Sequence, residues 1–167
     1  MHVIPFMLKE LEQEAETTRK FFGRIKQEDF QWQPHEKNMT LQKLSSHIAG
    51  LPIFVDVIIN SDQLDFANNN LERQVAETPE DLNKILDAAM QKATTALLSV
   101  RNEDDLLKTW TLKRGDTIIA AMSKYEAIRR MTLSHLIHHR SQLGVYLRLM
   151  NIAVPGTYGP SADEKLF

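Results

Sequence analysis

The chain has 167 residues, a formal net charge of −2 and no cysteine. The length is typical of one domain, the near-zero charge offers no electrostatic footprint for nucleic acid, and the lack of cysteine excludes disulfides, thiolate zinc sites and cysteine nucleophiles. Neither a secretory signal nor an apolar run of about 18 residues that could span a membrane is visible. We therefore expect one cytoplasmic domain over residues 1–167, with neither nucleic acid nor membrane as partner.

Two amphipathic helices are predicted in the first 60 residues. The first covers residues 4–26, where apolar side chains recur at alternating steps of four and three, as in helical bundles. The second runs from Thr40, a good N-cap residue, to Asn60. His47 occupies a core-type position on its apolar stripe. Pro52 lies inside this helix and removes a backbone donor, so we expect a kink near His47.

The middle of the chain predicts a long connection followed by a third helix. Residues 61–77 are polar and show no period. The sequence Thr78-Pro79-Glu80-Asp81 then combines an N-cap, a proline at the first helical position and two acids in the first turn. Farther on, residues 109–112 and 117–119 predict two short strands around a turn. We expect them to form a β-hairpin before the last helix.

The last predicted helix covers residues 123–150 and begins with a capping-box pattern at Ser123 and Glu126. The expected fold is therefore all-α, a four-helix bundle with a long crossover between its second and third helices and a short hairpin before the fourth. The fourth helix has a wide apolar arc, which favours a homodimer. The residues that extend this arc are Tyr125, Leu136, Leu143 and Leu147.

Histidines stand on the apolar stripes of two of these helices. At about 100° per residue, His139 falls about 40° from His135, so both imidazoles lie on the stripe of the fourth helix, one turn apart. Such a pair can direct two nitrogens at one divalent ion. A lone buried histidine such as His47 is more often a hydrogen-bonded core residue, but burying two neighbouring imidazoles without a shared partner costs desolvation twice.

A site with three histidines follows if His47 faces the pair His135 and His139. Three imidazoles leave coordination positions open, which is the pattern of catalytic metal sites. His138 lies about 60° to the other side of His135, so we expect it beside the ligands or at the surface. His135 with His138 remains an alternative pair. Gln142 is the nearest polar side chain on the stripe and is suited to orienting a ligand or water.

Carboxylates that could serve as a general base do not share these stripes. Glu126 lies about 180° from His135, and Asp56 about 180° from His47. Hydrolysis usually requires such a base, so a nucleophile made by the metal itself, such as a bound thiolate, is favoured. Several arginines of the last helix fall on its polar side, and we interpret them as a solvated face rather than a nucleic-acid site. They are Arg129, Arg130, Arg140 and Arg148.

Two motifs in the chain resemble those of the DinB family, a superfamily of metal-binding proteins. The earlier motif comprises Trp32-x-Pro34 and Leu41-x-x-Leu44-x-x-His47-Ile48. The later and more specific one comprises His135-x-x-His138-His139-Arg140-Ser141-Gln142-Leu143, Tyr146-Leu147-Arg148 and Val154-Pro155-x-x-Tyr158-Gly159-Pro160-Ser161-Ala162-Asp163-Glu164. Together they extend over nearly the whole chain. One departure is Ser141, where many members have glycine, and a small residue still fits there.

The resemblance implies both a fold and a metal site. The fold is a four-helix bundle with an unusual helix order, a long crossover and frequent homodimers. The implied ligands of nickel or zinc are His47, His135 and His139. Some relatives transfer or use low-molecular-weight thiols and others are assigned as hydrolases, so the resemblance implies a metal-dependent thiol S-transferase or hydrolase acting on a small-molecule substrate. The alternative is a non-catalytic metal-binding protein or dimeric interaction module.

Overall fold

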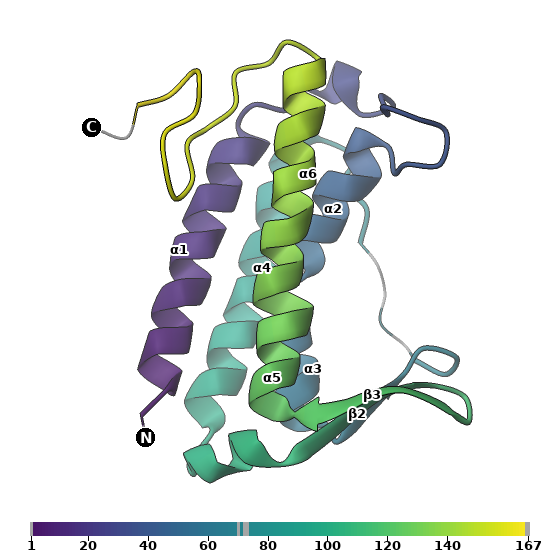
Figure 1. The fold of residues 1–167 in the computed structure, drawn as a ribbon, viewed down its shortest axis with the longest axis vertical. Coiled ribbons are helices and arrows are strands. Elements are labelled where there is room, and N and C mark those ends of the chain that lie inside the picture. Colours follow the sequence, from purple (N-terminus) through teal and green to yellow (C-terminus); the bar gives the residue numbers. More distant parts are fainter. Residues whose placement is uncertain (1, 70, 72–73, 166–167) are drawn as a thin grey trace.

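The computed structural model describes residues 2–69, 71 and 74–165, which are mostly helical with a small three-stranded sheet (Figure 1). The long helices lie side by side along the molecule, and the sheet covers one end of them. No helix among the described residues is long and apolar enough to cross a membrane. The elements are α1 (Ile4–Phe22), α2 (Leu41–Gly50), α3 (Ile53–Asn60), β1 (Gln63–Asp65), α4 (Pro79–Ser99), β2 (Thr109–Arg114), β3 (Thr117–Ser123), α5 (Lys124–Ile128), a π-helical segment (Arg129–Ser134) and α6 (His135–Leu149).

The single helix expected over residues 40–60 is two helices, α2 and α3. They are separated at Leu51 and Pro52, where the proline has no N–H to donate. The hydrogen bonds at this break are of the 3₁₀ type, since the Leu51 carbonyl accepts from the Phe54 N–H, three residues on, at 3.2 Å. The expected kink near His47 therefore lies one turn farther along the chain.

The expected hairpin is wrong as an isolated unit, because β2 and β3 belong to a sheet of order β1-β2-β3. β2 pairs antiparallel with β3, with a register irregularity between Leu112 and Lys113. β1 adds a parallel strand from the connection that shows no sequence period. Trp110 on β2 is fully buried, and its indole N–H donates to the Ser61 hydroxyl at 3.2 Å, which fixes the sheet to the end of α3. The prediction of an all-α fold is corrected accordingly.

The last predicted helix begins as expected but is interrupted. The Ser123 N–H donates to the Glu126 carboxylate at 2.9 Å, and the Glu126 N–H donates back to the Ser123 hydroxyl at 3.2 Å. Residues 129–134 then form the π segment between α5 and α6. The apolar arc that favoured a dimer is mostly internal, since the chain's own core contains Leu136, Leu143 and Leu147.

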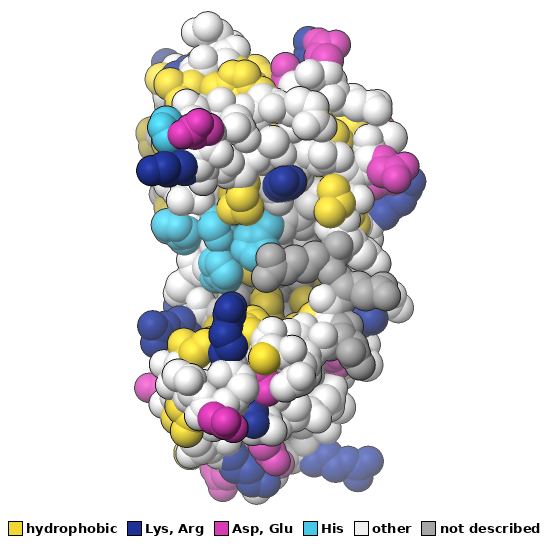
Figure 2. All heavy atoms as spheres, turned by 90° about the vertical axis from the view of Figure 1, so that its right-hand side faces the viewer, with side chains coloured by type: hydrophobic (Ala, Val, Ile, Leu, Met, Phe, Trp, Pro, Cys, Tyr) yellow, Lys and Arg dark blue, Asp and Glu magenta, His cyan; other side chains and the backbone are white. Residues whose placement is uncertain are grey.

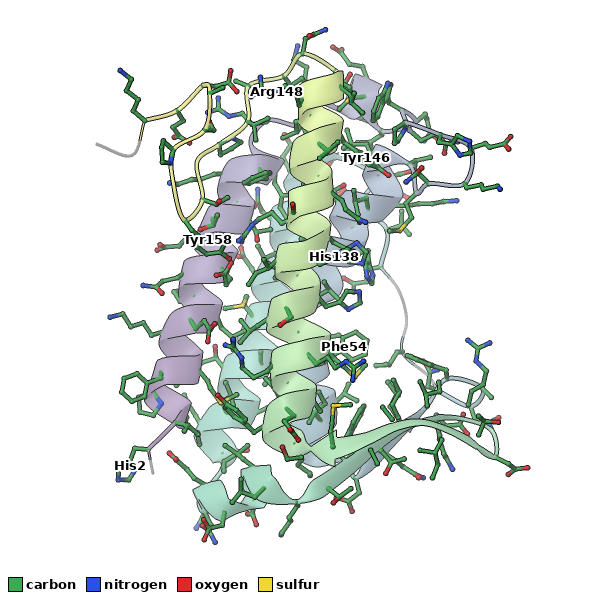
Figure 3. The ribbon with its side chains drawn as sticks, in the orientation of Figure 1. His2, Phe54, His138, Tyr146, Arg148 and Tyr158 are labelled. Atoms are coloured by element: carbon green, nitrogen blue, oxygen red, sulfur yellow. The ribbon has the colours of Figure 1, made fainter. Side chains whose placement is uncertain are left out.

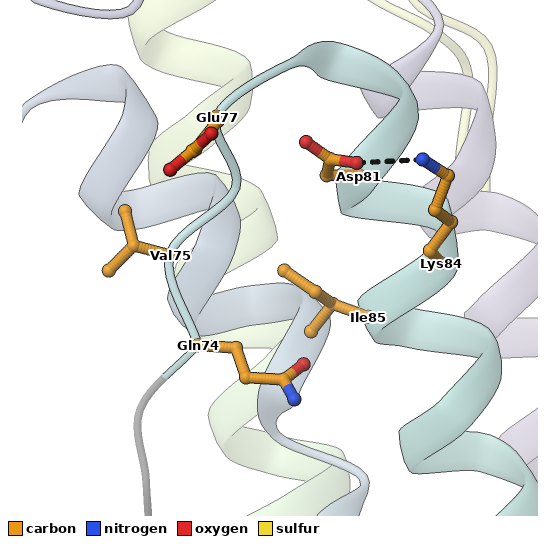
Figure 4. Close-up of a pocket in the computed structure, with 6 residues that line it drawn as sticks. All are labelled: Gln74, Val75, Glu77, Asp81, Lys84 and Ile85. Atoms are coloured by element: carbon orange, nitrogen blue, oxygen red, sulfur yellow. Dashed lines mark hydrogen bonds and ion pairs between the residues drawn. The ribbon is translucent and has the colours of Figure 1, made fainter.

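The crossover from the sheet to α4 is held against α2. The Ala76 N–H donates to the Ser46 hydroxyl at 3.0 Å, and the Ala76 carbonyl accepts from the Gln42 amide at 2.8 Å. A shallow, open pocket of about 400 Å³ lies where the crossover meets the start of α4 (Figure 4). None of the histidines lines it. Its lining residues are Gln74, Val75, Glu77, Asp81, Lys84 and Ile85.

Candidate metal centre

Three histidine side chains from two helices meet at one point. His139 Nε2 lies 2.9 Å from His135 Nε2, which in turn lies 3.4 Å from His47 Nε2. One ligand atom from each residue falls within 4.8 Å of the others. Nitrogens bound tetrahedrally to one zinc ion at ordinary bond lengths lie about 3.4 Å apart. The spacing of the three imidazoles therefore suits a single divalent ion.

The two rings on α6 are oriented by hydrogen bonds on their outer nitrogens. His139 Nδ1 lies 2.7 Å from the amide oxygen of Gln142, so this nitrogen carries the proton and donates it. The His135 ring bonds the backbone of Met131, one turn earlier in the π segment. In both rings the lone pair of Nε2 then faces the centre of the group. Hydrogen bonds on the outer nitrogen commonly fix the orientation and the tautomer of metal-binding histidines.

Burial keeps these imidazoles neutral. Desolvation lowers the pKa of His135 below its ordinary value, and the neighbouring His139 lowers it further. Desolvation also lowers the pKa of His139, although the bond to Gln142 opposes this shift. A cation is costly in a partly buried site. Neutral imidazoles with free lone pairs are the form in which histidine binds metals.

The remaining predicted residues of the site take outer positions. Gln142 contacts His139 directly. His138 is exposed, and its ring centre lies 5.0 Å from that of His139. It projects from α6 on the side of α2 (Figure 3), and a cluster of histidine side chains is exposed on one face of the molecule (Figure 2). Within the described part of the chain, the group with metal-ligand spacing contains His47 rather than His138, so the alternative pair is not supported.

The group holds no carboxylate among the described residues. The two acids that the helical periodicity placed away from the histidines are engaged elsewhere. Asp56 accepts from the Asn60 side chain at 2.8 Å, and Glu126 closes the capping box of α5. The Gln142 amide accepts a hydrogen bond from the outer nitrogen of His139 and so orients that ring.

A second polar cluster, which the sequence did not predict, lies between α1, α6 and the segment after α6. Arg140 is 1% exposed, although its helical position suggested a solvated face. Its guanidinium lies 2.5 Å from the Glu14 carboxylate and donates to the Tyr158 hydroxyl at 2.8 Å. That hydroxyl donates to Glu14 at 2.8 Å. Burial and the bond to Glu14 raise the pKa of Tyr158 to about 12.

Comparison with known proteins agrees with this fold. The sequence profile of the DinB family matches residues 3–165. YrdA, an uncharacterized protein of Bacillus subtilis, is 24% identical over 94% of this chain and 89% of its own length.

Two solved structures share the fold. A DinB-like protein from Bacillus cereus superposes with a TM-score of 0.69 at 21% identity, over 90% of this chain and 95% of its own. The DinB-like protein YjoA of Bacillus subtilis does so with a TM-score of 0.65 at 18% identity, over 96% and 98%.

Proposed function

Because the chain belongs to the DinB family, we propose that it binds one divalent metal ion, nickel or zinc, through His47, His135 and His139. The observation that carries this proposal is the convergence of three imidazole nitrogens within 4.8 Å of one another. The outer hydrogen bonds of His135 and His139 support it, because they present the free lone pairs to the same point. Three neutral ligands would leave the ion its full positive charge and open positions for a further ligand.

The proposed activity is that of a cytoplasmic metal-dependent enzyme acting on a small-molecule substrate, either a thiol S-transferase or a hydrolase. A divalent ion in such a site lowers the pKa of a bound water to about 7 or ionises a bound thiol. The chain contributes the three imidazoles and the Gln142 amide, which accepts a hydrogen bond from His139 and orients that ring. Within the described residues the histidine group includes no carboxylate, which favours transfer of a low-molecular-weight thiol over hydrolysis.

The alternative function is a metal-binding or dimeric interaction module without catalysis. Val145 and Leu149, one turn apart on α6, are each 57% exposed and favour association with a second copy of the chain. We propose a homodimer under either function. We also propose that α1, α4, the α2–α3 pair and the α5–α6 pair together constitute a four-helix bundle of the family's type.

The first test is the metal content of protein purified without a histidine tag. We expect about one nickel or zinc ion per chain in the wild type and loss of the ion in His135→Ala, because removing one of three imidazoles leaves too few ligands. His35→Ala is the matched control, since this histidine is exposed in a loop. A wild-type protein that stays metal-free after incubation with nickel and zinc would contradict the metal site and the enzyme together.

The second test separates catalysis from metal storage. Metal-loaded wild type should turn over a low-molecular-weight thiol with an electrophilic substrate, and His47→Ala and His139→Ala should reduce the rate to background. His35→Ala should keep it. If the loaded wild type shows turnover with neither thiols nor hydrolysable esters and amides, the non-catalytic alternative is favoured.

A further inference from the structure

The face that carries the histidines continues into an apolar surface toward the sheet. Hydrophobic side chains lie below the histidines in the space-filling view, beside a Lys or Arg side chain that borders the histidine cluster (Figure 2). Phe54 projects on the same side as His138, nearer the sheet (Figure 3). It is partly buried and packs against the core, so its position is fixed. The apolar surface therefore lies close to the candidate metal centre on the same face.

Gly50 leaves open space between His47 and Phe54. It follows His47 by three residues and so lies on a neighbouring part of the same helix face. A Cβ built on it would meet no heavy atom of the described chain within 4 Å. Phe54 lies beyond the break at Leu51 and Pro52, in the first turn of α3. A bare stretch of backbone thus separates the imidazole from the aromatic ring.

Met131 belongs to a segment that packs against α3, the helix that carries Phe54. It lies in the π segment one turn before His135 and is partly buried against the core. Its backbone holds the His135 ring, which ties its position to the candidate metal centre. Methionine is flexible and polarizable, and it adapts to apolar groups of varied shape. The acid nearest in sequence to Phe54, Asp56, is bonded to Asn60.

We propose that the ligand of the metal centre carries an apolar arm, an alkyl or aryl group that lies over Gly50 between Phe54 and Met131. This inference rests on the proposed function, because the metal would bind the head group of the same molecule. The arm extends from the histidines toward the sheet. The site therefore discriminates among thiols or substrates by the length of their apolar group.

The test uses cobalt-substituted wild type and a series of straight-chain thiols, ethanethiol, butanethiol and hexanethiol. Cobalt absorbs visible light, so thiol binding is followed by the change in the spectrum, without turnover. Each methylene that is buried should strengthen binding by up to about fourfold. We expect affinity to rise along the series. Equal affinities for all three thiols would overturn the apolar arm while leaving the metal site intact, whereas failure to bind cobalt would overturn both proposals.

Two substitutions locate the arm. Phe54→Ala should weaken hexanethiol binding about tenfold and leave ethanethiol binding unchanged. Gly50→Leu should exclude hexanethiol, because the new side chain fills the open space without a clash at its Cβ. Phe6→Ala is the matched control, since this residue is 74% exposed on α1 and lies outside the proposed surface. Equal effects of Phe54→Ala on both thiols would overturn the placement.

Discussion

The Arg140 guanidinium and the Glu14 carboxylate form an ion pair that is 2% and 7% exposed at the level of side chains. Removing charges from water is expensive, and the penalty is offset only when every polar atom finds a partner. Here the partners are present: Arg140 also donates to the Glu14 carbonyl at 3.0 Å and to the Thr18 hydroxyl at 3.3 Å, while Tyr158 bonds both charged groups. The network is satisfied as long as all its members are present.

Arg140→Met should lower the free energy of unfolding by about 3–5 kcal/mol, because it leaves the Glu14 carboxylate buried without its cation. The double variant Glu14→Leu with Arg140→Met should cost less than Arg140→Met alone. Urea denaturation at neutral pH measures both. The matched control is Arg129→Met, since the pair of Arg129 with Glu10 is 39% and 35% exposed and such pairs contribute about 0–1 kcal/mol. A similar cost for both arginine variants would contradict the argument.

The N-termini of α2, α4 and α5 are capped by side chains that the sequence identifies well. At the start of α4, the Asp81 N–H donates to the Thr78 hydroxyl at 3.3 Å, and the Thr78 N–H donates to the Asp81 carboxylate at 3.0 Å. Hydrogen bonds from Lys84 and Thr78 lower the pKa of Asp81 from 3.8 to about 2. The ionised carboxylate is thus favoured in the folded state.

This capping box makes stability depend on pH in a definite direction. Because the folded pKa of Asp81 is depressed, its contribution is complete above about pH 4 and is lost as the pH falls toward 2. We expect Asp81→Asn to unfold at lower urea concentration than wild type near pH 5. The difference between the two midpoints should shrink as the pH approaches 2. A difference that stays constant over this range would argue against an ionised cap.

Two interruptions of the helices show where hydrophobic periodicity no longer predicts the backbone geometry. Pro52 predicts a break in the helix. The hydrogen bonds around it span three residues instead of four, and the break lies one turn beyond His47. The π segment has no comparable signal in the sequence. Residues Arg129–Ser134 have an ordinary helical composition, and only their backbone hydrogen bonds differ, because each spans five residues instead of four. Angles counted from His135 are therefore reliable within α6 and unreliable back into α5. The convergence of His135 and His139 was predictable because both lie in α6.

At the scale of the whole molecule, the sequence predicts a long-range contact only where both partners belong to a recognisable pattern. His47 and His135 are 88 residues apart, and their meeting was predictable because both lie on apolar stripes that a helical fold must bury. The burial of Arg140 was not, because its position among other arginines favours solvent, and only distant partners explain it. β1 was missed for a similar reason: three residues are too short for a period, and its pairing with β2 is long-range.

The polar network around Arg140 also has a consequence for the order of folding. The contact between Glu14 and Tyr158 spans 144 residues, so closing it restricts nearly the whole chain and is entropically costly until the helices between them have formed. During synthesis, α1 and α6 can pack before Tyr158 is available, but their buried charges then lack one partner. The hydrogen bonds between α1 and α6 are complete only when the segment that follows α6 folds back over these two helices. We therefore expect the packing of α1 against α6 to be completed late in folding.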